Sequence, residues 1–452
     1  MPLIISVSGM RGFVGSDLGA PEALKVGRIY GRLAANDGKP FVVASDSRIS
    51  SDALRSAVIA GLLAAGADVI DIGVAATPTA CLTVRRHAAA GGVIVTASHN
   101  PIQWNGIKLI GPDALAVDAQ RAEQIKTAFH QDPPEHASAT ECGRLKRDDQ
   151  AHQTHVQAVL AASDPRLIDD LRYRKVKVVL DSINGAGAHA GTMLLNALGC
   201  EVCGLNAEPT GRFAHTPEPI PENLTSLCQE VTRQGAQVGF AQDPDADRLA
   251  LVDETGRCIG EEYTLALAAW AVLAHRAGPL ATNLSTSRMV DDVAQWFGQK
   301  VIRTPVGEAH VARAVMQNNC PVGGEGNGGV IVPDVVPVRD SLSAMALVLQ
   351  LMVSRSKTIS QLVSELPKYQ MVKAKFECSR EKAAQVCQRL VQKYADQKID
   401  TADGVRIDFP DERAWVHIRP SNTEPIIRII AEARDQARAD ELVDMLAAET
   451  GR

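Results

Sequence analysis

Residues 41–69 read FVVASDSRISSDALRSAVIAGLLAAGADV, and this stretch decides the fold. It opens with the apolar run 41–43, continues with an Ala/Leu-rich stretch over 53–65, and reaches Gly66 shortly before a second apolar run near Val69. The short runs predict buried strands. The longer stretch predicts a helix, which commonly ends at a glycine with positive φ. The segment therefore predicts a strand, a helix and a second, parallel strand.

The same unit occurs twice more along the chain. The two further copies comprise 176–179, 187–198, Gly199 and the run from Val202, and then 280–282, 287–297, Gly298 and the run from Val301. Each copy predicts a βαβ crossover. We therefore expect an α/β fold class, with three similar α/β/α domains whose sheets are mixed and mostly parallel.

The chain after residue 367 breaks this pattern. Strands are predicted over 369–378 and near 404–408, 414–418 and 425–431, and helices over 381–394 and from about 435 to 449. This order is typical of a C-terminal α+β domain with an antiparallel sheet. Four domains are therefore expected around a central cleft, over residues 1–150, 151–255, 256–367 and 368–452.

Two polar stretches interrupt the apolar periodicity. Gln131–Gln150 carries many charges and two prolines, so it is predicted to be the first linker between domains. The Pro-rich stretch 208–223 is predicted to be a long functional loop within the second domain, because apolar periodicity resumes on both sides of it.

Composition excludes several classes of protein. The 452 residues carry 47 Lys and Arg against 53 Asp and Glu, and the net charge of −6 argues against a nucleic-acid partner. No apolar stretch approaches the roughly 18 residues needed to cross a bilayer, so no membrane association is expected. The N-terminus lacks a signal-peptide pattern, and the nine cysteines are scattered and odd in number. A cytoplasmic protein with reduced thiols is therefore expected.

The first loop whose side chains are suited to catalysis or binding is residues 96–101, TASHNP, which follows the predicted strand 92–95. Its proline disfavours helical angles at the preceding residue, so the chain is expected to turn. The turn would present Ser98 at the carboxyl end of the strand, where open α/β sheets bind ligands. Lys108 follows and offers a cation for a phosphate on that serine. A capping turn with a surface lysine is the alternative.

The second loop, residues 242–248, reads QDPDADR and lies between two predicted strands. The carboxylates of Asp243, Asp245 and Asp247 repel one another unless a cation neutralises them, and such oxygen ligands suit Mg²⁺ or Ca²⁺. Arg248 stands where a calcium-binding EF-hand needs glycine, and the flanks are strands instead of helices, which excludes that motif. The loop predicts a metal site, with a solvated acidic turn as the alternative.

The third loop, residues 323–329, reads GGEGNGG. Its glycines let the backbone approach a ligand closely, and Glu325 with Asn327 offers the acceptors and the donor that suit vicinal sugar hydroxyls. A Gly-rich hairpin turn is the alternative.

The fourth loop, residues 419–425, reads RPSNTEP between two predicted strands. A guanidinium, two hydroxyls and an amide in five residues predict an anion cradle, to which Arg428 adds a second cation. The residues that supply these groups are Arg419, Ser421, Asn422 and Thr423. An Asn/Ser turn capped by an ion pair is the alternative.

These four loops, in this order, resemble those of the α-D-phosphohexomutase family over the whole chain. The strings at 96–101 and 243–248 are the most specific motifs. The resemblance implies that Ser98 is a phosphoserine that holds Mg²⁺ together with the three aspartates, Asp243, Asp245 and Asp247. It also implies that Arg248 supports the phosphate, and that Arg11 of the string 8–12, SGMRG, lies near it.

The resemblance also assigns the substrate contacts. Glu325 and Asn327 are implied to touch sugar hydroxyls, and Glu308, in the string 304–308, to recognise sugar orientation. The non-reacting phosphate is implied to be gripped by Arg419, Ser421, Asn422, Thr423 and Arg428.

The sugar loop departs from the string Gly-Glu-x-Ser-Gly-His of many bacterial members, because Asn327 replaces the serine and Gly329 the histidine. No proton-transfer role of that histidine can be carried over, which leaves Lys108, His99 or Glu325 as candidate proton carriers. The asparagine favours amino sugars, although relatives that act on mannose and glucose phosphates share it.

The resemblance implies that hexose 6-phosphate and hexose 1-phosphate are interconverted through the phosphoserine, with glucosamine 6-phosphate as the favoured substrate. Mg²⁺ is the implied cofactor and a hexose 1,6-bisphosphate the primer. A small-molecule sugar phosphate is the expected partner, and a monomer or homodimer the expected state. The alternatives are a phosphomannomutase or phosphoglucomutase, a Mg²⁺-dependent sugar-phosphate phosphatase, and a non-catalytic sugar-phosphate sensor. His215 and His310 are expected to be surface or packing residues.

Overall fold

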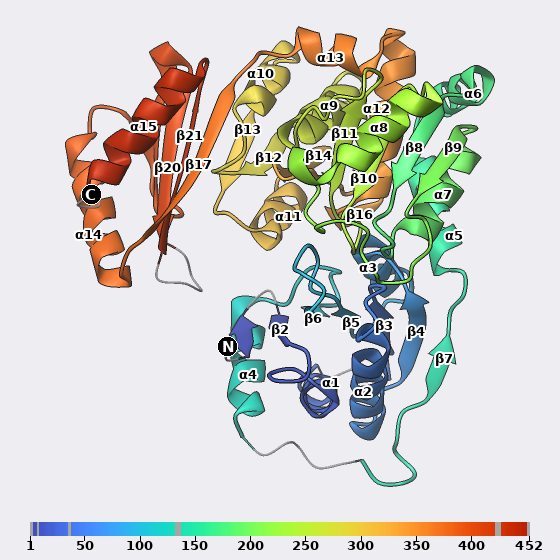
Figure 1. Cartoon of the computed structure of the whole chain (residues 1–452). Coiled ribbons are helices and arrows are strands. Elements are labelled where there is room, and N and C mark those ends of the chain that lie inside the picture. Colours follow the sequence, from blue (N-terminus) through green and yellow to red (C-terminus); the bar gives the residue numbers. More distant parts are fainter. Residues whose placement is uncertain (1–2, 7–8, 35–37, 132–136, 421–425, 450–452) are drawn as a thin grey trace.

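The computed structural model describes residues 3–6, 9–34, 38–131, 137–420 and 426–449. Within these ranges the strands form four sheets that follow one another along the chain, with helices packed against them (Figure 1). Three sheets mix parallel and antiparallel strands, and the fourth is antiparallel throughout. The expected fold class is confirmed.

The first sheet has the strand order β1-β2-β6-β5-β3-β4-β7. Its strands are β1 (Ile4–Ser6), β2 (Gly9–Phe13), β3 (Phe41–Ser45), β4 (Val69–Val74), β5 (Gly91–Val95), β6 (Trp104–Ile110) and β7 (Leu145–Arg147). Its helices are α1 (Ala20–Leu33), α2 (Ser51–Ala64), α3 (Thr77–Arg86) and α4 (Ala119–Phe129). Apolar residues of α1, α2 and α4 pack on one face and those of α3 on the other.

The second sheet has the order β11-β10-β8-β9. It comprises β8 (Lys177–Asp181), β9 (Glu201–Leu205), β10 (Val238–Gln242) and β11 (Leu249–Asp253), with α5 (Ala151–Ala162), α6 (Pro165–Arg174), α7 (Ala188–Ala197), η1 (Pro221–Asn223) and α8 (Thr225–Gln234). β10 and β11 form an antiparallel hairpin, so the aspartate-rich segment 243–248 is its turn.

The third sheet has the order β13-β12-β14-β15-β16. It comprises β12 (Leu280–Asn283), β13 (Val301–Thr304), β14 (Val322–Glu325), β15 (Gly329–Val332) and β16 (Val336–Arg339), with α9 (Glu262–Leu273), α10 (Met289–Trp296), α11 (Glu308–Gln317), α12 (Ser341–Arg355) and α13 (Ile359–Glu365). The glycine-rich segment is the turn of the antiparallel hairpin between β14 and β15.

The fourth sheet has the order β17-β21-β20-β19-β18. It comprises β17 (Gln370–Glu377), β18 (Lys398–Asp400), β19 (Val405–Phe409), β20 (Ala414–Pro420) and β21 (Ile426–Ala433), with α14 (Arg380–Lys393), η2 (Pro410–Glu412) and α15 (Gln436–Glu449). Apolar residues of α14 and α15 join those of the sheet in one core.

The repeated unit explains the three α/β sheets. Each predicted strand, helix and strand is present, and the glycine that ends each helix has a positive φ: +85° at Gly66, +79° at Gly199 and +65° at Gly298. A residue with a Cβ is strained at such angles, which is why this position is glycine in all three copies.

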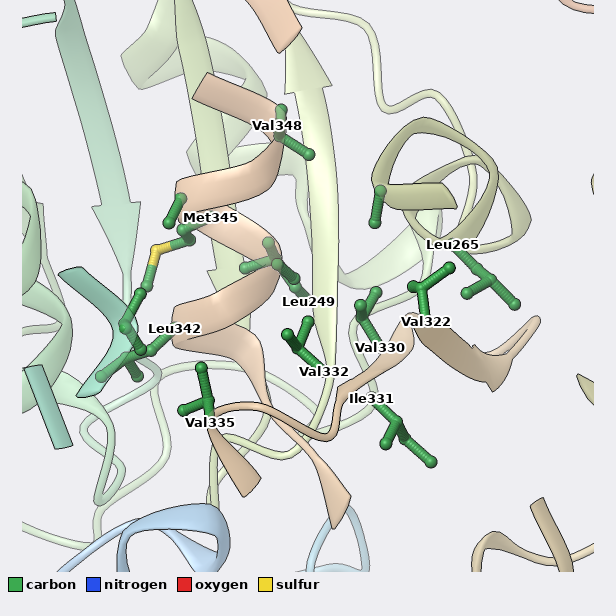
Figure 2. Packing of buried hydrophobic residues seen from close by; sticks show 14 of the residues in the cluster. Leu249, Leu265, Val322, Val330, Ile331, Val332, Val335, Leu342, Met345 and Val348 are labelled. Carbon is green, nitrogen blue, oxygen red and sulfur yellow. The ribbon is translucent and has the colours of Figure 1, made fainter. Parts of the chain in front are cut away.

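The largest apolar core is continuous through the first three sheets. Figure 2 shows Leu249 of β11 beside Val330 and Val332 of β15, and these residues belong to one apolar cluster with Leu342 of α12. Since Leu249 follows the aspartate-rich turn and Val330 follows the glycine-rich turn, this shared core fixes the two turns relative to each other.

One prediction about the chain path was wrong. Part of the proposed linker 131–150 forms β7, which pairs in parallel with β4 at the edge of the first sheet. The three residues of β7 are exposed, so no apolar pattern marks the strand. The strand β18 also lies outside the predicted elements. Residues 208–223 form the predicted long loop, with only the short η1 within it. The exact domain boundaries stay predictions.

Among the described residues no helix has both the length and the apolar composition needed to cross a membrane. All nine cysteines lie within the described ranges, and all are free thiols.

Candidate active site

One cavity of about 900 Å³ is lined by residues from all four sheets and their loops. The predicted site residues that line it are Arg11, Ser98, His99, Lys108, Arg248, Glu308, Glu325, Asn327, Arg419 and Arg428. The aspartates of the 243–248 turn are fully buried beneath it. Ser421, Asn422 and Thr423 lie outside the described residues.

Ser98 lies in the turn after β5 with φ at +50°, a left-handed conformation that residues other than glycine rarely adopt. Its N–H donates to Thr96 Oγ1 at 2.9 Å, and its hydroxyl donates to Asp243 Oδ2 at 3.0 Å. His99 Nδ1 lies 3.3 Å from the same hydroxyl. Strained residues of this kind persist where the surroundings hold them, and they cluster at functional sites.

Arg48 holds the Ser98 turn in place. Its guanidinium donates to the carbonyl oxygens of Ser98 at 2.6 Å and Asn100 at 2.7 Å, and it also reaches those of Pro101 and Trp104. Its Nε donates to Asp46 Oδ2 at 3.0 Å, and neither side chain of this ion pair is exposed.

The three aspartates form a compact carboxylate cluster. One oxygen from each lies within 4.8 Å of the other two. Asp243 Oδ1 accepts hydrogen bonds from the N–H groups of Asp247 and Arg248. In contrast, Oδ1 of Asp245 and Oδ1 of Asp247 are buried with no hydrogen-bond partner.

This cluster fits a hard divalent cation. Burial raises the pKa of Asp243 well above its usual value, and the charges of Asp247 and Asp245 raise it further. Unpaired buried carboxylate oxygens are costly in free energy. Oxygen ligands around a small space are what Mg²⁺ binds, so an ion would satisfy these atoms.

Lys108, on β6, is a cation in direct contact with the cluster. Its Nζ lies 2.7 Å from Asp245 Oδ2 and 3.7 Å from Asp247 Oδ2. Burial alone would lower the pKa of Lys108, but the two carboxylates outweigh it and raise the pKa above its usual value. Lys108 is therefore a fixed positive charge. Thr77 also donates to Asp245 Oδ2, at 2.7 Å.

Arg11 on β2 and Arg248 add positive charge on the cavity side. Burial lowers the pKa of His99 to about 3, and the charges of Arg248 and Arg11 act in the same direction. The imidazole is therefore neutral near pH 7.

The glycine-rich turn is joined directly to the aspartate-rich turn, because the N–H of Leu249 donates to the carbonyl of Gly328 at 2.9 Å. Glu325 ends β14, and its two oxygens accept hydrogen bonds from Asn283 Nδ2 and Arg339 Nη1, each at 2.8 Å. Asn327 lines the cavity, and its Oδ1 is buried without a hydrogen-bond partner.

Arg339, at the end of β16, connects three of the predicted site carboxylates. Besides Glu325, its Nη2 donates to Asp247 Oδ2 at 2.5 Å and lies 3.6 Å from Glu308 Oε2. Its backbone N–H donates to Glu308 Oε1 at 3.0 Å. The side chain is only 9% exposed.

Arg419 and Arg428 face each other on adjacent strands, since they are direct partners in the register of β20 and β21. Two cations placed opposite each other repel, unless an anion lies between them. Asp403 Oδ2 lies 3.1 Å from Arg419 Nε and accepts a hydrogen bond from the N–H of Val306 at 3.0 Å. The fourth domain is thereby tied to the loop that precedes Glu308.

Sequence reasoning missed several residues of this site. Asp46 and Arg48 stand in the segment after β3, and Thr77 is the first residue of α3, shortly after β4. A polar residue at the carboxyl end of a central strand was the available signal. Nothing local distinguished Arg339 from a surface arginine. His310 lines the cavity, although the sequence favoured a surface or packing role.

Comparisons with known proteins agree with this geometry. Family models described as "Phosphoglucomutase/phosphomannomutase, alpha/beta/alpha domain" I, II and III match residues 3–135, 153–256 and 260–369. The corresponding "C-terminal domain" model matches residues 370–449.

Curated relatives match over nearly the full length. A "Phosphoglucomutase/phosphomannomutase" of Thermococcus kodakarensis is 39% identical, with 98% of each chain covered. A "Probable phosphoglucosamine mutase" of Methanopyrus kandleri is also 39% identical, over 97% of this chain and 95% of the relative.

Among solved structures, a phosphoglucomutase/phosphomannomutase family protein of Burkholderia thailandensis matches with a TM-score of 0.86 and 26% identity. The match covers 99% of this chain and 97% of the other. The relatives and the architecture agree on an enzyme with phosphohexomutase activity. With four family models matched in order along its length, the chain belongs to the phosphoglucomutase/phosphomannomutase family.

Proposed function

We propose that this enzyme interconverts hexose 6-phosphate and hexose 1-phosphate through a phosphoserine at Ser98 and a hexose 1,6-bisphosphate. The observation that carries the proposal is the Ser98 hydroxyl, held 3.0 Å from Asp243 Oδ2 in an aspartate cluster that has two carboxylate oxygens without hydrogen bonds. A nucleophile next to a metal site is the arrangement that phosphoryl transfer requires.

Asp243, Asp245 and Asp247 would hold Mg²⁺ together with the phosphate on Ser98. When bound, the ion would neutralise charge on the phosphoryl group during its transfer. Arg11, Lys108 and Arg248 line the same part of the cavity, and they would orient the phosphate oxygens.

In the proposed reaction the free hydroxyl oxygen of a hexose monophosphate attacks the phosphorus of phosphoserine, and the bond between phosphorus and Ser98 Oγ breaks. The hydroxyl loses its proton, and Ser98 Oγ takes one up. The bisphosphate then turns round, and Ser98 accepts its other phosphoryl group.

We propose His99 as the proton carrier at Ser98 Oγ, because its Nδ1 lies 3.3 Å away. The other two candidates are occupied. Lys108 is paired with Asp245, and Glu325 accepts from Arg339 and Asn283.

Arg419 and Arg428 are proposed to grip the phosphate that does not react, together with Ser421, Asn422 and Thr423. Glu308, Glu325 and Asn327 are proposed to contact the sugar hydroxyls. A clamp in a separate domain suits this chemistry, because it must hold either phosphate in turn and help to exclude water.

Glucosamine 6-phosphate is the first candidate substrate, supported by Asn327 and by relatives named as phosphoglucosamine mutases. Mannose and glucose phosphates are the second candidate, supported by the relative from Thermococcus kodakarensis. A cytoplasmic location and a monomeric or homodimeric state stay predictions from the sequence.

The proposal is tested by incubating the enzyme with Mg²⁺ and glucose 1,6-bisphosphate and locating the added phosphate by mass spectrometry. Phosphate on Ser98 is expected. Ser98→Ala is expected to abolish mutase turnover and to leave Mg²⁺-dependent binding of hexose phosphate largely intact. A variant that retains near-normal interconversion would overturn the proposal, and steady release of inorganic phosphate would favour a phosphatase.

Substrate preference is tested by comparing kcat/KM for glucosamine, mannose and glucose phosphates, with Mg²⁺ and a bisphosphate primer. We expect the highest value for glucosamine phosphate. A clear preference for mannose or glucose phosphates would contradict the first candidate and support the second.

A further inference from the structure

Gly329, the first residue of β15, is glycine for a reason that lies in its surroundings. It is not among the described residues with positive φ, so its backbone accepts a side chain. An ideal Cβ at Gly329 would nevertheless lie 2.1 Å from Cδ and 2.8 Å from Cγ of Arg339. Real Cβ atoms do not approach other atoms this closely, so Gly329 provides the space that Arg339 fills.

Arg339 cannot easily move away from this space, because both ends of its guanidinium are anchored. One end donates to Glu325 Oε2 at 2.8 Å, and the other donates to Asp247 Oδ2 at 2.5 Å. The same residue holds Glu308 through its backbone N–H. A guanidinium that bridges two carboxylates in this way fixes geometry as well as charge.

Each of these partners has a place in the proposed reaction. Glu325 and Glu308 are the carboxylates proposed to contact the sugar, and Asp247 belongs to the metal cluster. With Oδ2 of Asp247 bound to Arg339, Oδ1 is buried without a hydrogen bond, 3.8 Å from Arg248 Nε. One guanidinium therefore sets the orientation of carboxylates that serve two different ligands.

We propose that Arg339 is a positioning residue that determines sugar recognition by holding Glu325 and Glu308 against the metal-binding turn, in the space that Gly329 leaves open. This inference rests on the proposed function for the identity of the ligands. Its geometric basis, the packing of Arg339 on Gly329, is independent of the reaction.

The first test removes the charge of Arg339 with Arg339→Gln. Glu325 would then keep only its hydrogen bond from Asn283, and Glu308 only the one from the backbone N–H at position 339, so KM for the hexose monophosphate is expected to rise about 10- to 100-fold. The fall in kcat is expected to be smaller than tenfold. The ratio of kcat/KM between glucose, mannose and glucosamine phosphates is expected to move toward one.

Mg²⁺ affinity provides a second measurement, because it is expected to rise in the same variant in which the affinity for the sugar phosphate falls. Loss of a cation that contacts Asp247 strengthens the attraction of the cluster for Mg²⁺, so the dissociation constant from calorimetry is expected to fall several-fold in Arg339→Gln. A change that merely loosens the fold would weaken the binding of both Mg²⁺ and the hexose phosphate. Weaker Mg²⁺ binding and an unchanged selectivity ratio would overturn the proposal.

The second test is a double-mutant cycle. Gly329→Ala adds a Cβ that pushes the guanidinium away from its partners, so it is expected to raise KM about tenfold without removing any charge. In an Arg339→Ala background the Cγ and Cδ atoms are absent, and Gly329→Ala is expected to add less than a twofold effect. Additive effects of the two changes would overturn the proposal.

Control variants separate the effect of losing Arg339 from the effects of losing any arginine or of misfolding. Arg276→Ala removes an arginine that pairs with Asp334 at the surface, where both side chains are about half exposed, and it is expected to leave all constants unchanged. If Arg339→Ala fails to fold, as judged by its thermal midpoint, Gly329→Ala and Arg339→Lys still decide the question. Lysine cannot bridge two carboxylates, so the KM of Arg339→Lys is expected to lie between that of the unmodified enzyme and that of Arg339→Gln.

The inference about Arg339 and the proposed function can be tested separately. Glucose 6-phosphate and glucosamine 6-phosphate binding can be measured by calorimetry in the Ser98→Ala background, where no turnover is expected. Absence of mutase turnover in the unmodified enzyme would defeat the proposed function alone. Unchanged binding of both sugar phosphates in Ser98→Ala/Arg339→Gln would defeat the inference about Arg339 alone.

Discussion

The guanidinium of Arg48 donates a hydrogen bond of 2.6 Å to the carbonyl oxygen of Ser98, from a loop 50 residues earlier in the chain. Its other contacts extend to the carbonyls of Asn100, Pro101 and Trp104. One buried side chain thus binds the backbone at Ser98 and at three residues that follow it. Ser98 is held by its carbonyl, and its hydroxyl is left to donate to Asp243 Oδ2.

Arg48→Lys is expected to lower kcat about 10- to 100-fold, because a lysine keeps the charge beside Asp46 but cannot reach four carbonyls at once. KM and Mg²⁺ affinity should change by less than about threefold, since neither ligand contacts Arg48. Steady-state kinetics and calorimetry measure these constants. Arg55→Lys, at the ion pair with Asp71 on α2 and β4, is the matched control. A kcat within twofold of the unmodified enzyme would contradict this role.

The main elements of the fold could be predicted because their signals are local. Each βαβ unit has its own apolar periods and its own glycine at the helix end, and these require no knowledge of distant partners. The segment β7 could not be predicted. Its residues are exposed, and only backbone hydrogen bonds to β4 make it a strand.

The candidate site, like the fold, could be predicted only where the signal is local. Ser98 and the three aspartates stand in turns that follow strands, so the sequence marks them directly. Arg339 was not predictable, because its partner Asp247 lies 92 residues away and many other cations occur in the chain. Which cation meets which carboxylate is decided by the tertiary packing, here by the core that joins β11 to β15.

Lys108→Met is expected to abolish most of the turnover, with kcat reduced at least about 100-fold, because a positive charge that is proposed to orient the phosphate oxygens is lost. The same change should strengthen Mg²⁺ binding several-fold, since Asp245 loses the cation that lies 2.7 Å from it. Calorimetry with the dephosphorylated enzyme measures the second effect. Weaker Mg²⁺ binding in Lys108→Met would show that Lys108 organises the carboxylates and does not compete with the ion.

His417 is expected to make the fold sensitive to acid. Burial lowers the pKa of this imidazole to about 4, against about 6.5 in an unfolded chain. Its ring nitrogens lie 2.9 Å from Ser285 Oγ and 2.6 Å from the carbonyl of Asp403, and the cost of burying a charged ring outweighs the attraction of the Asp403 carboxylate. Between these pKa values the unfolded chain binds a proton that the folded chain does not, so stability falls as pH drops from about 6.5 toward 4.

The loss that is due to His417 should reach at most about 3 kcal/mol over this interval. His417→Gln keeps a donor near the carbonyl of Asp403 and cannot titrate, so its free energy of unfolding should depend less on pH across the same range. Urea unfolding at about pH 7.5 and about pH 5 measures the difference. Parallel pH profiles for the two proteins would exclude His417 as a source of the acid sensitivity. His152, whose pKa burial also lowers to about 4, contributes in the same interval.

Asp403 is expected to couple the fourth domain to sugar recognition, because one carboxylate oxygen accepts from the N–H of Val306 and also faces Arg419 Nε. Asp403→Ala removes both contacts, so the loop before Glu308 and the guanidinium of Arg419 lose their common anchor. KM for the hexose phosphate should rise about tenfold, which corresponds to the loss of one charge-assisted hydrogen bond. Asp403→Asn keeps an acceptor for Val306 and loses only the charge, so its KM should rise less. Asp400→Asn, on the neighbouring β18, is the matched control. If Asp403→Ala and Asp400→Asn had the same KM as the unmodified enzyme, the two domains would recognise the substrate independently.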